Sequence, residues 1–220
     1  MTLRSTFIHN RRVNTKVMKA TVLHAEAAYT GFFELRRLTL EHERFAGGMT
    51  NPLVREVLHR SDVAAALLYD TALDKVVMVE QYRAGAHVAG VNPWLIDIVA
   101  GRIESGQTPL EAVRREIIEE SGLAPVSLDL IGVYLTAPHL SSEKVHLYCA
   151  TVNSLLASGS HGVAHEDEDI RPLVLSRAEA LCLPQIESLS LWAGLAISWL
   201  RDKSGGLQVD RTGVGDGTQT

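Results

Sequence analysis

The sequence predicts an α/β protein in which a mixed sheet lies between helices, preceded by a small N-terminal β-strand module. Three observations carry this prediction. Short apolar runs separated by turn residues are typical of buried strands, one helix is marked by capping residues at both ends, and the order along the chain is strands, helix, strands, helix. The 220 residues suffice for one globular domain with a modest extra module.

Strands are predicted on both sides of the capped helix. The stretch FFELRRLTLEHERF, residues 32–45, alternates bulky and charged side chains, which is typical of an exposed ribbon. Buried strands are predicted at VAAALLYD, KVVMVEQYR and WLIDIVAG before the helix, and further strands at LDLIGVYLT, KVHLYCATV and RPLVLSR after it. We expect a flexible N-terminus over 1–20, the strand module over 21–60, the main domain over 61–203 and a flexible tail over 204–220.

The central helix is predicted to run from Pro109 to Ser121. Thr108 and Glu111 form a capping box at its start, and Gly122 is a suitable left-handed residue at its end.

Apolar stripes on two helices are expected to face the core. In the central helix the stripe consists of Leu110, Val113 and Ile117. In a final helix, predicted from about Ser188 to Arg201, it consists of Leu189, Trp192, Leu195, Ala196, Trp199 and Leu200.

Composition excludes several classes of protein. The net charge of -5 offers no basic surface for nucleic acid, and no apolar run approaches the roughly 20 residues of a membrane span. Cys149 and Cys182 lie in apolar contexts without the spacing of a metal site, so we expect two buried thiols and no disulfide or zinc. These features predict a cytoplasmic protein.

The central helix carries an unusual cluster of carboxylates. Glu119 and Glu120 follow Glu116 by three and four positions, a spacing at which like charges on a helix repel. Arg114 and Arg115 neutralise only part of this cluster. A divalent cation would complete the neutralisation, and oxygen-only ligands suit Mg²⁺ or Mn²⁺. A solvated charged face is the alternative interpretation.

The spacing of these residues favours the cation. The segment GRIESGQTPLEAVRREIIEESGL resembles the signature of the Nudix hydrolases, G-x5-E-x7-R-E-U-x-E-E-x-G-U, in which U is aliphatic. One position departs, because Gln107 stands where the family usually has Glu. The matching residues are Gly101, Arg115, Glu116, Ile117, Glu119, Glu120, Gly122 and Leu123.

The resemblance implies an α/β/α sandwich and Mg²⁺-dependent hydrolysis of a nucleoside diphosphate linked to another group. It implies that Glu116, Glu120 and the Ala100 carbonyl bind the metal, and that Glu119 is a further ligand or supports the others. It also implies that Arg115 holds the carboxylates by ion pairing. Because the family's counterpart of Gln107 is mainly structural, we expect that departure to affect only the anchoring of the helix or loop.

Further segments are similar to the ADP-ribose pyrophosphatase branch of that family. They are Pro138, fifteen residues after Leu123, and the stretches VEQYR, NPWLIDIVAG and SGSHGVAHEDEDIR. Matching EDEDI to the branch implies Glu166 as the general base and Glu168 as a metal ligand. Such chemistry needs cations to neutralise the phosphates and a carboxylate to accept the proton of the attacking water. Asp97 departs from the branch, which more often has Glu there.

The remaining candidates concern the substrate and assembly. Arg83 is expected to contact phosphate or the distal ribose, with Arg55 and Glu143 as weaker candidates of the same kind. Pro138 is a further candidate for substrate binding, through the branch resemblance. Phe32, Phe33 and Tyr82 each could stack on the adenine. The branch resemblance implies a homodimer formed through the N-terminal strands, although these strands could equally extend the main sheet.

The predicted activity is Mg²⁺-dependent hydrolysis of ADP-ribose to AMP and ribose 5-phosphate. A pyrophosphatase acting on GDP-mannose or another nucleotide sugar is one alternative. The other is a sensor that binds the metabolite without hydrolysing it, for which Gln107 is the only support.

Overall fold

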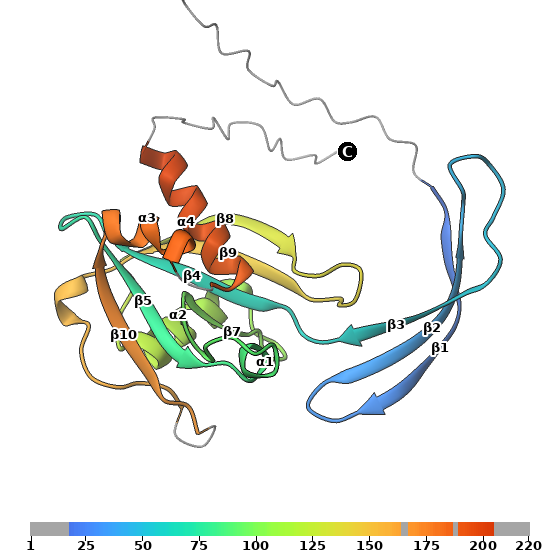
Figure 1. The fold of residues 1–220 in the computed structure, drawn as a ribbon, viewed down its shortest axis with the longest axis horizontal. Coiled ribbons are helices and arrows are strands. Elements are labelled where there is room, and N and C mark those ends of the chain that lie inside the picture. The colour runs from blue at the N-terminus through green and yellow to red at the C-terminus, as the bar shows by residue number, and fades with distance from the viewer. Residues whose placement is uncertain (1–17, 164–166, 187–188, 205–220) are drawn as a thin grey trace, which may run out of the picture. The chain divides into compact units, whose positions relative to one another are not determined.

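The computed structural model describes residues 18–163, 167–186 and 189–204. The chain divides into two compact units, Met1–His59 and Arg60–Thr220. Figure 1 labels the elements of both units, which we describe one at a time.

The first unit is a three-stranded antiparallel sheet in the order β1-β2-β3. Its strands are β1 (Ala20–Thr30), β2 (Glu34–His42) and β3 (Leu53–His59), and β2 coincides with the alternating stretch of the sequence. Arg37 on the central strand bridges to Glu26 on one neighbour and Glu56 on the other, at 3.3 and 3.2 Å. Every residue of β1 is exposed, so this sheet has no core of its own beneath that strand.

The second unit contains a seven-stranded mixed sheet. Its main path is β10-β5-β4-β9-β8, with β6 paired to β5 and β7 to β4, and the β4–β9 pair is the parallel one. The strands are β4 (Val63–Asp70), β5 (Lys75–Tyr82), β6 (Trp94–Asp97), β7 (Val99–Arg102), β8 (Ser127–Leu135), β9 (Lys144–Thr151) and β10 (Ile170–Ser176). The helices are α1 (Ala84–Val88), α2 (Pro109–Ser121), the 3-10 turn η1 (Ser154–Leu156), α3 (Arg177–Ile186) and α4 (Leu191–Ser204).

Helices cover both faces of this sheet, as the sequence predicts. Successive residues of a strand point to opposite faces, so β4 contributes Ala65 and Leu67 to one core cluster and Ala66 and Leu68 to the other. The first cluster packs against α3 and α4, and the second packs against α2 (Figure 1). The sheet between helices is therefore confirmed, and α2 has one face of the sheet to itself among the described helices.

The C-terminal part differs from the prediction by one helix. Residues from Arg177 onward form α3, which begins with a capping box: the Ser176 hydroxyl accepts from the Glu179 backbone at 3.2 Å, and the Glu179 carboxylate accepts from the Ser176 backbone at 2.7 Å. The Ser-x-x-Glu spacing of Ser176 and Glu179 is the sequence pattern that indicates the start of this helix. The last helix starts at Leu191, and the predicted start at Ser188 lies outside the described residues. None of the described helices is long and apolar enough to cross a bilayer.

The two cysteines are both unpaired but differ in exposure, so the prediction of two buried thiols was wrong for one of them. Cys149 lies on β9 against the core, whereas Cys182 lies on the solvent side of α3. Burial is the main cause that raises the pKa of Cys149 to about 12, and the nearby charge of Asp129 adds to it. Cys149 is therefore a protonated, enclosed thiol at neutral pH.

The difference in exposure between the two cysteines predicts one rapidly reacting thiol per chain. A disulfide reagent such as DTNB at pH 8 should react rapidly with Cys182, and with Cys149 only on unfolding, because thiolate and access are both needed. The measurement is the absorbance trace with and without denaturant. Cys182→Ser should remove the fast phase, and a fast phase that survives this substitution would contradict the assignment.

Candidate active site

The helix α2 is held at both ends by the local signals in its sequence. The Thr108 hydroxyl accepts from the Glu111 backbone at 3.3 Å, and the Glu111 carboxylate accepts from the Thr108 backbone at 2.8 Å. Gly122 ends the helix in a left-handed conformation with φ 69°. A glycine is required at this end because an added methyl group would also collide with the ring of His161.

The inward face of α2 is more acidic than the predicted stripe. Val113 and Ile117 are fully buried, but Leu110 is 43% exposed, so the prediction was wrong for Leu110. Glu116 and Glu120 are instead buried, at 8% and 3% exposure. The buried face of the helix carries these two glutamates beside Val113 and Ile117, whereas Leu110 lies in the first turn and stays exposed.

Strand β7 provides the wall that faces the two buried glutamates. The Ala100 backbone donates to the Glu120 carboxylate at 3.1 Å. Gly101 lies so close to the Glu116 carboxylate that an added methyl group would overlap it. Because the N–H and C=O groups of an extended residue point to the same side, the Ala100 carbonyl also faces the side on which Glu120 lies.

Arg115 holds the outer side of the carboxylate cluster. Its guanidinium binds Glu116 at 2.7 Å and Glu119 at 2.6 Å. It also donates to the Arg102 carbonyl at 3.1 Å, which ties α2 to the end of β7. These contacts are the ion pairs that the Nudix resemblance implies for Arg115. They orient two of the three carboxylates of the cluster formed by Glu116, Glu119 and Glu120.

The site holds more carboxyl groups than this arginine can pair. Burial raises the pKa of Glu116 to about 7; Arg115 opposes this, and the charges of Glu119 and Glu168 add to it. Burial also raises the pKa of Glu120 well above its usual range, against the opposing charge of Arg83. Both shifts mean that burial disfavours the charged form of these carboxylates, and a bound cation would stabilise that form.

The donor set fits a hard divalent cation. Glu116, Glu120 and the Ala100 carbonyl present only oxygen, which is the ligand type of Mg²⁺ and Mn²⁺. Within the described ranges, no three acidic, histidine or cysteine side chains are already gathered closely enough to hold a metal ion. The carboxylates of Glu116 and Glu119 are instead ion-paired with Arg115, so cation binding would rearrange these side chains.

Glu168 and Glu166 belong to the segment before β10. Glu166 lies outside the described residues. The Glu168 carboxylate accepts from the Val163 backbone at 3.2 Å, and its charge contributes to the raised pKa of both Glu116 and Glu120. The structure thus brings Glu168 into the electrostatic environment of the α2 carboxylates.

Arg83 stands at the end of β5 beside a buried carboxylate. Its guanidinium lies 3.6 Å from Asp97, which is 2% exposed. Asp97 also accepts from the Ser190 hydroxyl at 2.6 Å and the Ile98 backbone at 2.8 Å. Asp97 therefore links Arg83 to Ser190 at the start of α4. Sequence reasoning missed Ser190, whose only signal is its position just before a helix.

Gln107, the departure from the family pattern, anchors the loop before α2. Its side-chain oxygen accepts from the Glu104 backbone at 3.2 Å, and its own backbone donates to the Glu104 carbonyl at 3.0 Å. A neutral amide makes this contact as well as a carboxylate would. The anchoring expected for this position is present.

Two other candidates are already engaged by protein groups. Glu143 is 4% exposed; it forms an ion pair with Arg60 at 2.6 Å and accepts from the Thr136 hydroxyl at 2.9 Å. A substrate contact would have to share these oxygens. Pro138 lies exposed in the turn that precedes Glu143. Arg55 belongs to the first unit, on β3, where its guanidinium donates to the Val54 carbonyl at 2.8 Å.

The three aromatic candidates lie in two places. Phe32 and Phe33 are in the first unit, with their rings 4.7 Å apart edge to face. Tyr82 is in the second unit, with its ring 5.5 Å from Trp94 and 6.1 Å from His87.

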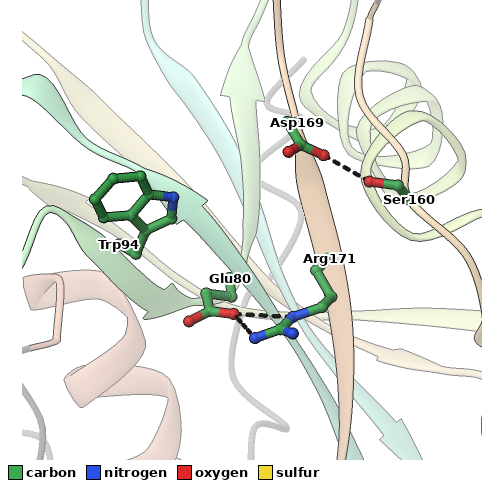
Figure 2. A pocket seen from close by; sticks show the side chains of 5 residues that line it. All are labelled: Glu80, Trp94, Ser160, Asp169 and Arg171. Carbon is green, nitrogen blue, oxygen red and sulfur yellow. Dashed lines mark hydrogen bonds and ion pairs between the residues drawn. The ribbon is translucent and has the colours of Figure 1, made fainter.

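A pocket of about 330 Å³ lies at the end of β5, β6 and β10 (Figure 2). Its lining residues are Glu80, Trp94, Ser160, Asp169 and Arg171. Glu80 and Arg171 face each other in register across β5 and β10 and form an ion pair. The Ser160 hydroxyl donates to Asp169 at 2.6 Å. Sequence reasoning did not find this pocket, although alternation along β5 and β10 places both charged residues on one face.

Comparisons with known proteins identify the family that this chain matches and several of its relatives. A family model described as the NUDIX domain matches residues 58–193. The ADP-ribose pyrophosphatase of Escherichia coli K12 is 35% identical over 181 residues, which cover 82% of this chain and 87% of the relative. That of Haemophilus influenzae is 34% identical over 186 residues, 82% and 85% of the two chains.

More distant matches extend the comparison. The GDP-mannose pyrophosphatase of Pectobacterium atrosepticum is 31% identical over 153 residues, which cover 69% of this chain and 78% of the relative. A solved structure of an ADP compounds hydrolase superposes with a TM-score of 0.65 at 20% identity, covering 87% of this chain and 98% of the other. At that identity the superposition shows a common fold.

Proposed function

The chain belongs to the NUDIX family, and from this premise we propose that it hydrolyses the pyrophosphate bond of ADP-ribose to AMP and ribose 5-phosphate. It is a hydrolase. The observation that carries the chemistry is the pair of buried glutamates, Glu116 and Glu120, packed against the backbone of Ala100 and Gly101. The choice of substrate is supported by the bacterial ADP-ribose pyrophosphatases that match most of the chain.

Glu116, Glu120, Glu168 and the Ala100 carbonyl would hold Mg²⁺, for which Mn²⁺ is a possible substitute, and Glu119 would be a further ligand. When bound, the cation supplies charge neutralisation at the phosphate oxygens and acidifies the attacking water. The assignment is supported by buried oxygen donors whose mutual repulsion a cation would offset. Arg115 orients the carboxylates through its ion pairs.

The reaction needs a base and an anchor for the substrate. We assign the base to Glu166, which takes a proton from the water that attacks phosphorus while the bridging phosphorus–oxygen bond breaks. Arg83 is suited to bind the departing or distal phosphate, because Asp97 holds its guanidinium close enough for its charge to reach Glu120.

Further substrate contacts remain part of the proposal. Arg55, Glu143 and Pro138 are retained as candidates. The adenine would stack on one of the three aromatic candidates, Phe32, Phe33 or Tyr82.

A homodimer formed through the first unit is also proposed. Strand β1 is an edge of its sheet, and the apolar side chains of Val22, Leu23 and Tyr29 on it are exposed. An edge strand with apolar side chains favours pairing with a second copy of the chain. A cytoplasmic location is consistent with two unpaired thiols.

Competition between two substrates tests the proposed activity. The purified chain is incubated with Mg²⁺ and equal amounts of ADP-ribose and GDP-mannose, and the monophosphates are separated by chromatography. AMP is expected to form first, and its formation should stop when EDTA is added. Preferential GMP would assign the chain to the nucleotide-sugar activity named for the Pectobacterium relative. Binding of ADP-ribose without any product would identify a sensor and overturn the catalytic proposal.

A further inference from the structure

Two sets of hydrogen bonds join residues 160–161 to residues 169–170, on either side of the segment that carries Glu168. His161 and Ile170 exchange backbone hydrogen bonds of 2.8 and 3.0 Å, which form an isolated antiparallel bridge. Next to this bridge the Ser160 hydroxyl donates to Asp169 at 2.6 Å, as Figure 2 shows. Residues on the two sides of the segment are therefore held together where β10 begins.

The first residue beyond the bridge attaches this segment to α2. The backbone N–H of Gly162 donates to the Glu119 carbonyl at 2.9 Å. Glu119 lies in the last turn of α2, where the final carbonyl groups of a helix have no partner within the helix. Gly162 supplies that partner. The segment is thus tied to the end of the helix that carries Glu116 and Glu120.

Gly162 also leaves room for Glu168. Its φ of 106° is one that residues with side chains rarely adopt, and an added methyl group would lie 2.8 Å from the Glu168 Cβ and 2.9 Å from its carbonyl oxygen. The residue after Gly162, Val163, donates to the Glu168 carboxylate at 3.2 Å. Glu168 therefore packs directly on the Gly162 backbone, and its carboxylate is held by the adjacent peptide.

We propose that Gly162 is a positioning residue: its bond to the Glu119 carbonyl and its missing side chain place the Glu168 carboxylate beside α2 for cation binding. This inference rests on the proposed function, in which Glu168 is a metal ligand. The contacts of Gly162 with the Glu119 carbonyl and with Glu168 support the placement. A side chain at position 162 would push Glu168 away from its contacts with the Gly162 and Val163 backbone.

A matched pair of glycine substitutions tests the inference. Gly159 lies three residues before Gly162 with a φ of 83°, and nothing lies within 4 Å of an added methyl group there. Gly159→Ala and Gly162→Ala therefore carry a similar backbone penalty, but only the second displaces Glu168. The probe is Mn²⁺ alone, with its affinity for the full chain measured by calorimetry. The dissociation constant should rise about 10-fold in Gly162→Ala and stay within about 2-fold in Gly159→Ala.

Glu168→Gln completes a double-mutant cycle that separates this inference from the proposed function. The substitution alone should weaken Mn²⁺ binding by about 10-fold, but by no more than about 2-fold in the Gly162→Ala background, because Glu168 is already displaced there. If Glu168→Gln alone changes nothing, the metal role of Glu168 fails, and this inference fails with it. If Glu168→Gln weakens binding and Gly162→Ala does not, or if their effects multiply, only the positioning role fails.

Thermal unfolding of each variant shows whether it is folded when its affinity is measured. If Gly162→Ala does not fold, the cycle is repeated with Ser160→Ala, which removes the side-chain hydrogen bond at the base of the segment. A rise of about 3-fold in the Mn²⁺ dissociation constant, absent in the Glu168→Gln background, is then expected. Unchanged affinity in Ser160→Ala would overturn the inference.

Discussion

Replacing Glu120 with glutamine is expected to slow AMP formation from ADP-ribose by on the order of 10³-fold, equivalent to about 4 kcal/mol of transition-state stabilisation. Glu120 is 3% exposed, and its carboxylate lies against the Ala100 backbone. A glutamine oxygen can still accept this hydrogen bond, so the fold should survive. The charge that would attract the cation is lost. Initial rates at saturating Mg²⁺ measure the effect.

The same substitution should leave the metal-free protein at least as stable as the wild type. Burial and the charges of Glu116 and Glu168 disfavour the ionised Glu120, so a neutral side chain of the same size removes an unfavourable term. Calorimetric unfolding in EDTA should show an unchanged or higher Tm. Glu104→Gln, which changes an exposed carboxylate in the loop before α2, is the matched control and should retain full activity. An active Glu120→Gln variant would contradict the assigned role of Glu120. An unfolded variant would contradict the expected stability.

Replacing Gly101 with alanine is expected to lower activity by about 100-fold through a purely steric effect. The added methyl group would overlap the carboxylate of Glu116, which is itself fixed by Arg115 at 2.7 Å. Either β7 or Glu116 must move, and both belong to the proposed metal site. Overpacking of this kind also costs about 1–3 kcal/mol of folding stability. Chemical unfolding and the Mg²⁺ dependence of the rate measure the two effects.

Gly194→Ala provides the control for this substitution. Gly194 lies in α4, and no atom lies within 4 Å of an added methyl group. Alanine is favoured over glycine in a helix, so this variant should gain about 0.5–1 kcal/mol and keep its activity. A Gly101→Ala variant as active as Gly194→Ala would show that the close approach of Gly101 and Glu116 has no functional role.

Local patterns predicted the elements that surround the site. The Thr108 to Glu111 capping box and Gly122 fixed both ends of α2, and the structure has the helix at those residues. The same kind of signal at Ser176 and Glu179 was present but not used, and α3 was missed as a result. Capping depends on groups three or four residues apart, so it can be found in the sequence without knowledge of the rest of the fold.

The sequence predicted less well which side chains of a helix are buried and which residues far apart in the chain are in contact. The apolar pattern of α2 placed Leu110 in the core, but Leu110 lies in the first turn and stays exposed, whereas Glu116 and Glu120 are buried beside Val113 and Ile117. A hydrophobic stripe cannot reveal that two carboxylates share the buried face. The predicted burial of Cys182 failed for a similar reason, because apolar neighbours in the chain do not determine which side of a helix meets the core.

The sequence by itself determined the family, the spacing of the carboxylates and both ends of α2, because each depends on residue types at short separations. Only the tertiary structure decided what those carboxylates meet. Gly101 comes against Glu116 because β7 pairs with β4 beneath α2, and Gly162 meets the Glu119 carbonyl because β10 returns to the edge of the same sheet. Contacts between residues far apart in the chain are set by sheet pairing and core packing, whose energy is distributed over the whole domain.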